Sequence, residues 1–545
     1  MNYNKKITLG LAVLQSTYLL ADTEAAKPNI ILIVTDQQSY NTISALRDAY
    51  PGVDTYSSTP NIDRLVNSGI SFTNTYCANP VSVPSRFAMF TGLYGGKYNI
   101  RDNQHETSVQ SVVTPVLNQY AMGNLFKAGG YQTYYAGKVH LPYATANGSM
   151  FGHPVNYGFT EYISDDDREI MGRDVANFIK KRTTSNPFLL VASFINPHDI
   201  CLESSTNLTG APVVDPKKPE IAATVNLARA SADVVGLSNY PQLPFNKPKT
   251  IGFPDKFTPS VFDNFPDDYW RRYRYIYSWM VNLVDSHIGE ILNALDASAL
   301  KNNTIIVFTS DHGEMQGAHN ATVKNLPFEE CQRVPFIISG PGIVQKQRDN
   351  ALINNGTDLM PTICELAGIS YPSALTGVSL AKRSKGLGTV SQRQYLYTEG
   401  DGFSNIVDHV NGYKYTQFHI TGNPEMLIDL NTDPGELTDI SKKNQTTIAK
   451  TTEMRNVLVS ALANSGIKTG IKKTENTSGL KLKQNAQTLE IYGLKPHSAL
   501  LVYNSQGMII KNIVVAGESE LLSVTDLKTG VYFVRNEGNT IKFIR

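Results

Sequence analysis

The sequence predicts an α/β fold in which helices cover both faces of a mostly parallel sheet. Three runs of β-branched and other apolar residues, at 28–36, 188–194 and 304–311, have the continuous hydrophobicity of central strands buried on both faces. Helical periodicity is clearest at 273–295, where the apolar residues form one stripe. The alternation of strands and helices indicates an α/β/α sandwich.

The pattern of residues in the sequence changes after about residue 375. Short strands separated by Gly, Asn and Pro, followed by a helix at 446–463, predict a small antiparallel-sheet subdomain at 376–465. Residues 466–484 are rich in Lys, Thr, Ser and Gly, which is typical of a linker. The alternating segments of 485–545 predict an appended small β-sandwich. The main α/β domain then spans 22–375.

The first 21 residues have the features of a secretory signal peptide. Lys5 and Lys6 precede an apolar stretch at 7–20 that is short for a membrane span, and cleavage is expected near Ala21. No other run reaches about 18 apolar residues. We therefore expect an exported protein without a membrane span, located in the periplasm or at the cell surface, or secreted.

The overall charge excludes whole-molecule recruitment of nucleic acid or anionic membranes. The chain has 49 Lys and Arg against 48 Asp and Glu, a net charge of +1, so any anion must be bound by a local cluster of cations. The four cysteines have no C-x-x-C spacing, which argues against a zinc site. Their number and spacing are compatible with one disulfide or with buried free thiols.

The segment 82–92 carries the strongest functional signal. Pro84 fixes its own φ and disfavours helix at Val83, whereas the apolar spacing from Arg86 onward is helical, so Ser82 is expected at a loop-to-helix junction. Free N–H groups at such a junction favour an anion, and sulfate is one. Ser-x-Pro-Ser-Arg alone would equally describe a surface turn with an N-capping serine.

Extended to Thr91 and Gly92, this segment resembles the signature of type I sulfatases, which belong to the alkaline phosphatase superfamily. In that family a Cys or Ser at the first position is oxidised to formylglycine by a sulfatase-maturating enzyme. The resemblance implies that Ser82 is this residue, as in the Ser-type enzymes of Bacteroidetes. It also implies an alkaline-phosphatase-like fold, and it covers about residues 28–440. Only Val83 departs from the pattern, standing where a small residue is usual.

The same resemblance implies one divalent metal ion at the ends of two strands. The family places its metal at the motifs that correspond to Asp36 and Gln37 and to Asp311 and His312, together with the modified Ser82. Gln37 stands where many relatives have a second Asp, and His312 where Asn is common, so the site is less negative. We expect Ca²⁺. Taken alone, either aspartate could equally be a helix N-cap.

Five further residues receive roles from the resemblance. Lys138 would hold the sulfate, His140 would take the proton that lets the covalent intermediate collapse, and Arg86 would stabilise the formylglycine. His198 is a candidate general acid, and Lys324 would contact the leaving oxygen. Lys138 and His140 are two residues apart and would share one side of an extended segment.

The sequence leaves three functions open. The predicted function is hydrolysis of sulfate monoesters by an exo-acting carbohydrate O-sulfatase that acts on host glycans. Phosphonate monoester and phosphodiester hydrolases share the fold and fit Gln37 and His312, although they usually lack the pair formed here by Lys138 and His140. A catalytically dead, glycan-binding homologue is the third reading.

Outside these motifs, the sequence also leaves alternative interpretations open. The insertion at 201–268 either lines a substrate pocket or packs on the core as a surface excursion. Three histidines, His105, His319 and His419, could touch sugar hydroxyls or have structural roles. The last residues, 530–534 and 542–545, resemble C-terminal sorting domains of the Bacteroidetes secretion pathway, and a carbohydrate-binding module is the alternative.

Overall fold

The computed structural model describes most of the chain, namely residues 27–50, 56–103, 110–142, 153–206, 219–254, 265–322, 324–388, 393–467, 480–484, 487–504, 509–528, 530–536 and 539–545. The predicted signal peptide at 1–21, His105 and most of the predicted linker at 466–484 lie outside the described residues.

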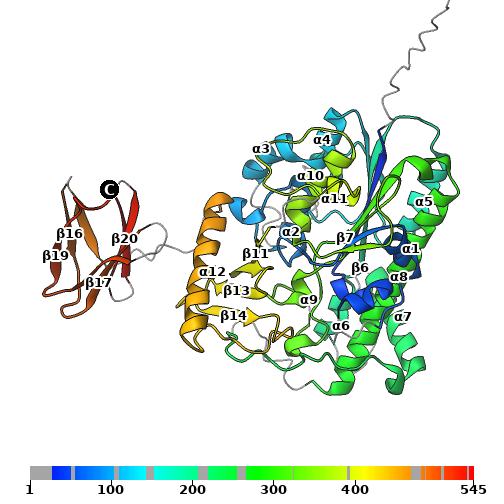
Figure 1. The fold of residues 1–545 in the computed structure, drawn as a ribbon. Helices are drawn as coiled ribbons and strands as arrows, with labels where there is room; N and C mark the ends of the chain where they lie inside the picture. Colours follow the sequence, from blue (N-terminus) through cyan, green and yellow to red (C-terminus); the bar gives the residue numbers. More distant parts are fainter. Residues whose placement is uncertain are drawn as a thin grey trace, which may run out of the picture.

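The central sheet has eight strands in the order β5-β4-β6-β1-β7-β8-β2-β9 (Figure 1). These strands are β1 (Asn29–Asp36), β2 (Gly69–Phe72), β4 (Gln132–Gly137), β5 (Glu161–Ser164), β6 (Phe188–Pro197), β7 (Thr304–Ser310), β8 (Phe336–Ser339) and β9 (Gln347–Asp349). The strands from β5 to β7 are parallel, β8 is antiparallel to both of its neighbours, and β2 and β9 are parallel. The prediction of a mostly parallel sheet is confirmed, and the three predicted strands lie side by side at its centre.

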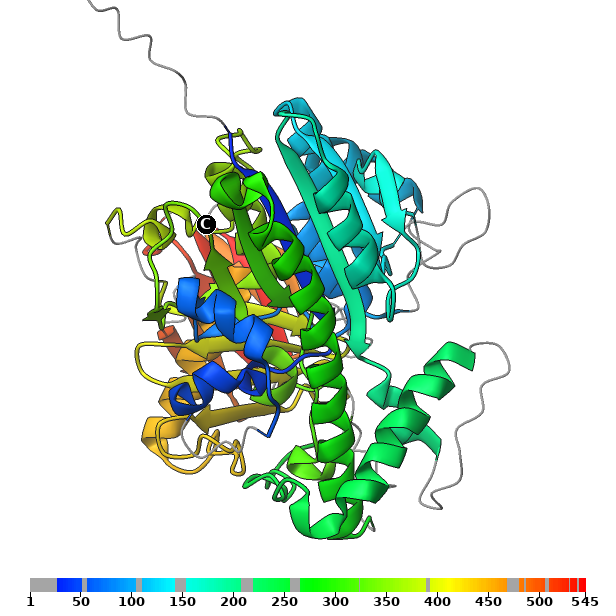
Figure 2. The same ribbon diagram turned by 90° about the vertical axis from the view of Figure 1, so that its right-hand side faces the viewer.

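Helices cover both faces of this sheet because the side chains of β1 alternate between two apolar clusters (Figures 1 and 2). Ile30, Leu32 and Val34 face one cluster, whereas Ile31 and Ile33 face the other. The helices of the first cluster are α2 (Ser82–Thr91), α3 (Gln110–Tyr120), α4 (Met122–Ala128) and α10 (Asn355–Leu366), and those of the second are α1 (Pro60–Ser68), α5 (Met171–Lys181) and α8 (Asp267–Asp296). Burial of each such side chain contributes about 2 kcal/mol, so β1 stabilises the packing on both faces of the sheet.

Helix α8 begins six residues before the predicted start at Tyr273. Pro266 stands at its N-cap, and Asp267 and Asp268 in its first turn complement the helix dipole. The predicted insertion packs against this end of α8 through α6 (Ile200–Thr206) and α7 (Pro219–Val235) (Figure 2). Ala222, Val225, Ala228, Ala232 and Tyr240 of the insertion therefore pack against α8, as the surface-excursion alternative expects, whereas Leu227, Val234 and Phe245 are exposed.

The C-terminal subdomain contains an antiparallel sheet in the order β11-β12-β13-β14. Its elements are β11 (Tyr395–Gly400), β12 (Phe403–Asp408), β13 (Tyr413–Phe418), β14 (Glu425–Asp429) and the helix α12 (Gln445–Asn464), which packs on one face. On its other face, Phe403 and Phe418 pack with Met315 and Phe328 from the segment that follows β7. The subdomain thus supports the loop that carries Asp311.

Two small sheets form the end of the chain. Their orders are β15-β16-β19 and β18-β17-β20-β21, and they share an apolar cluster that includes Leu489, Leu500, Leu522 and Val534. The strands are β15 (Lys481–Gln484), β16 (Thr488–Tyr492), β17 (Ala499–Asn504), β18 (Ile509–Val514), β19 (Ser519–Ser523), β20 (Val531–Asn536) and β21 (Asn539–Ile544). This arrangement agrees with the predicted β-sandwich.

The remaining predictions concern thiols and membrane crossing. All four cysteines are free, so the disulfide that the sequence allowed does not form. Within the described ranges, no helix combines the length and the apolar composition needed to cross a bilayer.

A buried ionic cluster joins the C-terminal sheet to the main domain. Lys414 on β13 lies 2.9 Å from carboxylate oxygens of Glu329, in α9 (Glu329–Gln332), and of Glu436. His319, Glu330 and Glu436 also bring possible ligand atoms together, but the Lys414 ammonium already supplies a cation beside this group. The His319 ring stacks on Phe328 at 3.7 Å and contacts Thr250. These contacts favour a structural role for His319.

We predict that His319 makes the protein sensitive to acid. Burial and the nearby Lys414 lower the pKa of His319 to about 3. In the unfolded chain the ring protonates near pH 6.5, so stability is full above that pH and falls as the pH is lowered towards 3. Between pH 7 and pH 4.5 this one group should cost about 2.5 kcal/mol.

The variant His319→Asn should lose correspondingly less stability between these two pH values. Urea unfolding can be followed by tryptophan fluorescence, because both tryptophans, Trp270 and Trp279, lie in α8. Equal losses in the parent and the variant would contradict the assignment.

Candidate active site

Polar residues gather where the three central parallel strands end. Asp36 is the last residue of β1, Asp311 follows β7, and His198 follows β6. The register pairs Thr35 with Ser310 and Asp36 with Pro197, so the three strand ends lie next to one another. This is the edge at which open α/β sheets bind ligands.

Ser82 lies at this edge as the first residue of α2. Its hydroxyl is fully buried, 3.1 Å from Asp36 Oδ2 and 3.0 Å from His312 Nε2. The loop-to-helix junction is where the sequence predicted it, but Val83 is helical, contrary to expectation. The reason is that Pro84 falls in the first turn of α2, where a missing N–H breaks no intrahelical hydrogen bond.

The Asp36 carboxylate is the centre of the site. Its Oδ2 accepts hydrogen bonds from Lys138 Nζ at 2.5 Å and Arg86 Nη2 at 3.2 Å, in addition to Ser82. Its Oδ1 is buried and accepts no hydrogen bond from the residues that the structure describes. Burial alone would raise the pKa of Asp36, but the positive charge of Lys138 and the other basic groups around it hold that pKa well below its usual range.

Arg86 links the two aspartates. Its Nε donates to Asp311 Oδ2 at 2.9 Å and its Nη1 to Ser193 Oγ at 2.8 Å, and the whole side chain is buried. Burial and the negative charge of Asp36 raise the pKa of Asp311 to about 7, against the lowering effect of Arg86. The site therefore holds two carboxylates that repel each other and that a cation would stabilise.

Gln37 and Lys324 also meet in this site. Gln37 has a left-handed backbone with φ of 69°, and its N–H donates to Asp311 Oδ1 at 3.1 Å. Its Oε1 accepts from Lys324 Nζ at 2.8 Å, while its Nε2 donates to Glu314 Oε2 at 2.5 Å. Lys324, which the sequence could place only by resemblance, thus contacts Gln37, and its charge also helps to lower the pKa of Asp36.

The two histidines with proposed proton-transfer roles are His198 and His140, and Lys138 acts electrostatically on His198. Desolvation of the His198 ring and the charges of Lys324 and Lys138 hold its pKa well below the usual range, so the imidazole is neutral. His140 also lowers the pKa of His198 electrostatically, which places the two rings near each other. The predicted extended segment is wrong at this point, because β4 ends at Gly137 and His140 has φ of 43°.

The residues present fit a divalent cation. Asp36, Asp311 and His312 offer ligand atoms that all lie within 4.8 Å of one another. His312 Nδ1 donates to the Gly313 carbonyl at 2.9 Å, so the Nε2 lone pair is directed at Ser82 and its surroundings. The buried Oδ1 of Asp36, which accepts no described hydrogen bond, completes a donor set that could hold a divalent cation.

Several supporting residues escaped the sequence analysis. Tyr277 Oη donates to the Gln37 carbonyl at 2.7 Å, and Asn355 Nδ2 donates to the Ser310 carbonyl at 2.6 Å. Tyr277 lies inside the predicted helix 273–295, and Glu314 lies three residues after Asp311, but nothing in the sequence sets either residue apart from the polar residues around it. His419 has a pKa lowered to about 4 by burial and Arg101, so its ring is neutral.

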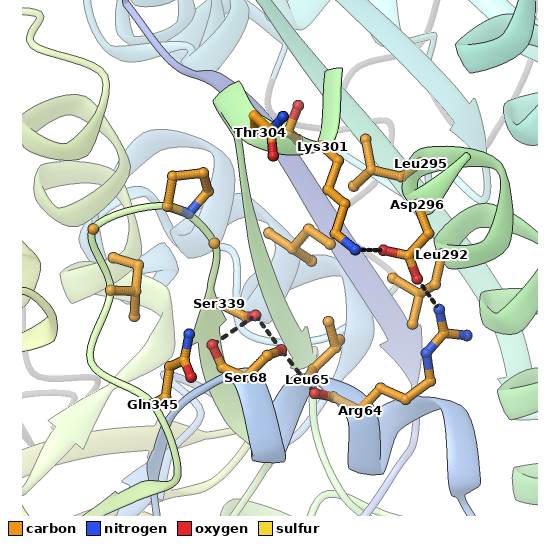
Figure 3. Close-up of a pocket in the computed structure, with 16 residues that line it drawn as sticks. Arg64, Leu65, Ser68, Leu292, Leu295, Asp296, Lys301, Thr304, Ser339 and Gln345 are labelled. Atoms are coloured by element: carbon orange, nitrogen blue, oxygen red, sulfur yellow. Dashed lines mark hydrogen bonds and ion pairs between the residues drawn. The ribbon is translucent and has the colours of Figure 1, made fainter. Parts of the chain in front are cut away.

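A separate cavity of about 430 Å³ lies at the opposite edge of the sheet (Figure 3). Thr304 begins β7 and Ser339 ends the antiparallel β8, so both mark the end remote from Asp311. The charged groups at this cavity, Arg64, Asp296 and Lys301, pair with one another. The cavity therefore lies apart from the residues assembled around Asp36.

Comparison with known proteins identifies the family. The sequence profile of the sulfatase family matches residues 28–369, more than half of the chain. The chain belongs to the sulfatase family. A second profile, that of the C-terminal region of N-sulphoglucosamine sulphohydrolase, matches residues 317–463 of this sulfatase.

Relatives of the sulfatase include enzymes from Bacteroides thetaiotaomicron. It is 28% identical to a Δ4,5-hexuronate-2-O-sulfatase over 433 residues, which cover 76% of this chain and 85% of the relative. It is 25% identical to an N-acetylglucosamine-6-O-sulfatase, with 77% and 84% covered. The family and these relatives make the protein a sulfuric ester hydrolase.

Solved structures confirm the alkaline-phosphatase-like fold of the sulfatase. A 2-O GAG sulfatase superposes with a TM-score of 0.61 at 24% identity, covering 81% of this chain and 92% of that one. The phosphonate monoester hydrolase of Agrobacterium radiobacter superposes with a TM-score of 0.57 at 19% identity, covering 80% and 96%. The fold is thus common to both enzyme classes.

We predict that Asp36→Asn weakens the binding of a divalent cation, measured with Ca²⁺, by at least about 100-fold, because the change removes the negative charge of the carboxylate. Isothermal titration calorimetry measures the affinity. The control Asp285→Asn alters another buried carboxylate, which accepts N–H groups of Asn61 and Ile62 at the start of α1, and should keep the parental affinity. Parental affinity in Asp36→Asn would refute the metal assignment.

Proposed function

We propose that this sulfatase removes O-sulfate groups from carbohydrates, with Ser82 oxidised to formylglycine and with Ca²⁺ bound beside it. The observation that carries the proposal is the position of the Ser82 hydroxyl, 3.1 Å from Asp36 and 3.0 Å from His312, at a site ringed by basic side chains. Asp36, Gln37, Asp311 and His312 would hold the cation, which supplies charge stabilisation to sulfate oxygens and to the nucleophile.

The basic residues of the site have matching tasks. Lys138 Nζ and Lys324 Nζ both reach the cation-binding residues, so they lie where equatorial sulfate oxygens would develop charge. Burial lowers the pKa of Lys138, against the raising effect of the Asp36 charge. Arg86 stays fixed between the aspartates and holds the formylglycine environment rather than moving with the substrate.

Proton transfers fall to the two histidines in this proposal. His198 would protonate the departing alcohol, with Lys324 beside it, and His140 would accept the proton whose removal releases sulfate. The hydrated aldehyde supplies two hydroxyl groups, and this is the chemistry that an unmodified serine lacks. The neutral state of His198 in the free protein is compatible with a group that charges only when an anionic sulfate is bound.

Carbohydrate substrates are supported by the relatives. Both Bacteroides enzymes are named for O-sulfated sugars, and a structural neighbour was solved with D-glucosamine-2-N,6-O-disulfate as its substrate. We infer that the sulfatase acts on a terminal sugar of a host glycan, after export that begins with the signal-like segment at 1–21 and after modification by a maturating enzyme. The sorting-like end of the chain would assist export.

Sulfated sugars should therefore be hydrolysed in a position-selective manner. We expect one isomer among 2-O-, 3-O-, 4-O- and 6-O-sulfated monosaccharides to be turned over, because the carbon that bears the sulfate fixes where the ring contacts the site. Ion chromatography of released sulfate measures the reaction. Inactivity of the matured enzyme on every isomer would refute the carbohydrate assignment.

Phosphonate monoester hydrolysis is the second candidate function. Gln37 and His312 in the cation set, and the shared fold, favour it, whereas the positions of Lys138 and His140 near the carboxylate and His198 favour sulfate. We predict a higher kcat/KM on an aryl sulfate than on the matched phenyl phosphonate, and a loss of at least about 100-fold on both in Lys138→Ala. A clear preference for the phosphonate would reverse the assignment.

A catalytically dead glycan-binding homologue is tested by intact mass. Oxidation of Ser82 removes two hydrogen atoms, about two mass units, from protein produced in its native host, and Ser82→Ala should show neither the mass change nor activity. Native protein with an unmodified serine and undiminished sugar binding would support the dead homologue.

A further inference from the structure

We propose that Glu314 is a positioning residue that fixes the orientation of the Gln37 amide and thereby completes the cation site. The inference rests on the proposed role of Gln37 in holding the cation. Nothing in the signature motifs of the sequence pointed to Glu314, which follows Asp311 by three residues.

The contact between the two side chains is direct and buried. Gln37 Nε2 donates to Glu314 Oε2 at 2.5 Å, and both residues are fully buried. A carboxylate can only accept here, so the amide nitrogen must face Glu314 and the amide oxygen must face the other way. On that other side, Gln37 Oε1 accepts from Lys324 Nζ at 2.8 Å and from the Cys201 thiol at 3.4 Å.

Glu314 itself is held by two elements. Its Oε1 accepts a hydrogen bond from Tyr273 Oη at 2.7 Å, and its backbone N–H donates to Ser39 Oγ at 2.9 Å. Tyr273 and Tyr277 are one turn apart on α8, and Tyr277 donates to the Gln37 carbonyl. One helix therefore supports Gln37 twice, through its backbone directly and through its side chain by way of Glu314.

Loss of Glu314 would release the amide. The two faces of a glutamine amide have the same shape, so without a carboxylate the group can turn by 180° and present Nε2 to Lys324 and the cation. That orientation directs positive partial charge at positive charge. Molecules with that orientation would lack the Gln37 oxygen as a ligand.

The contact also gives a reason for glutamine at position 37. An acidic side chain there would face the Glu314 carboxylate with no hydrogen to donate, and like charges at hydrogen-bond distance cannot both ionise. An amide satisfies both neighbours at once, since it donates to Glu314 and accepts from Lys324. Gln37 and Glu314 are thus a matched pair.

A double-mutant cycle on Ca²⁺ affinity tests the proposal. We expect Glu314→Ala to weaken Ca²⁺ binding by about 10-fold, Gln37→Ala by a similar factor, and the double variant no more than Gln37→Ala alone. A role in general stability would give additive losses instead. Glu314→Gln keeps an acceptor for the Gln37 amide and should stay within about threefold of the parent.

Glu399 provides a matched control. It is a buried glutamate that, like Glu314, accepts a tyrosine hydroxyl, here from Tyr397, but it belongs to β11 and accepts its other hydrogen bond from the Gly96 N–H. Glu399→Ala should leave Ca²⁺ affinity unchanged, with circular dichroism confirming the fold of each variant.

Three results would overturn the role of Glu314: unchanged affinity in Glu314→Ala, additive losses in the double variant, or no Ca²⁺ or Mg²⁺ binding by the parent. If Glu314→Ala does not fold, a loss of more than about threefold in Glu314→Gln that is just as large in the Gln37→Ala background would also overturn it. Because the readout is binding, a failure of sulfate hydrolysis with the coupling intact would count against the proposed function and not against Glu314.

Discussion

The buried carboxylate of Asp36 is the interaction on which the rest of the site depends. Burial without compensation would force it to take up a proton, but Lys138 and Arg86 donate to one of its oxygens and keep it ionised. Removing one partner from a buried ion pair of this kind typically costs about 3–5 kcal/mol. Lys138, Arg86 and Asp311 are therefore constrained together, although they come from distant parts of the sequence.

The central sheet explains how these charged side chains can lie close together. Parallel strands β6, β1 and β7 end at the same level, and apolar side chains on both faces hold their register. Polar residues can then gather at the strand ends without entering the core. The C-terminal sheet supports the site from outside the main domain, because Phe403 and Phe418 pack on the segment that leads from Asp311 to Lys324.

The sequence predicted the parts of this structure that follow from local pattern. Continuous apolar runs located β1, β6 and β7, and the apolar stripe located most of α8. The start of α8 was missed because its first turns pack against the insertion, which no periodicity in the helix reveals. The backbone of His140 was also missed, since a left-handed conformation in a non-glycine residue is imposed by its neighbours.

The same distinction applies to the residues of the site, some of which follow from local sequence pattern while others do not. Ser82, Asp36 and Asp311 were found because they sit beside recognisable strands or motifs. Glu314 and Tyr273 act through side-chain hydrogen bonds that form only in three dimensions, and neither spacing nor composition distinguishes them from other polar residues of the core. Gln37 was noted as a departure from the family, but the partner that accounts for it became visible only in the folded chain.

The burial of Ser82 affects whether the serine can be modified before or after the chain folds. Its hydroxyl has no contact with solvent, and α2 is wedged between the sheet and α10. A second protein could not bind this segment of the chain once the chain has folded. The proposed enzymatic conversion of the serine would therefore take place on the nascent or still-extended polypeptide, and molecules that fold before it would remain unmodified.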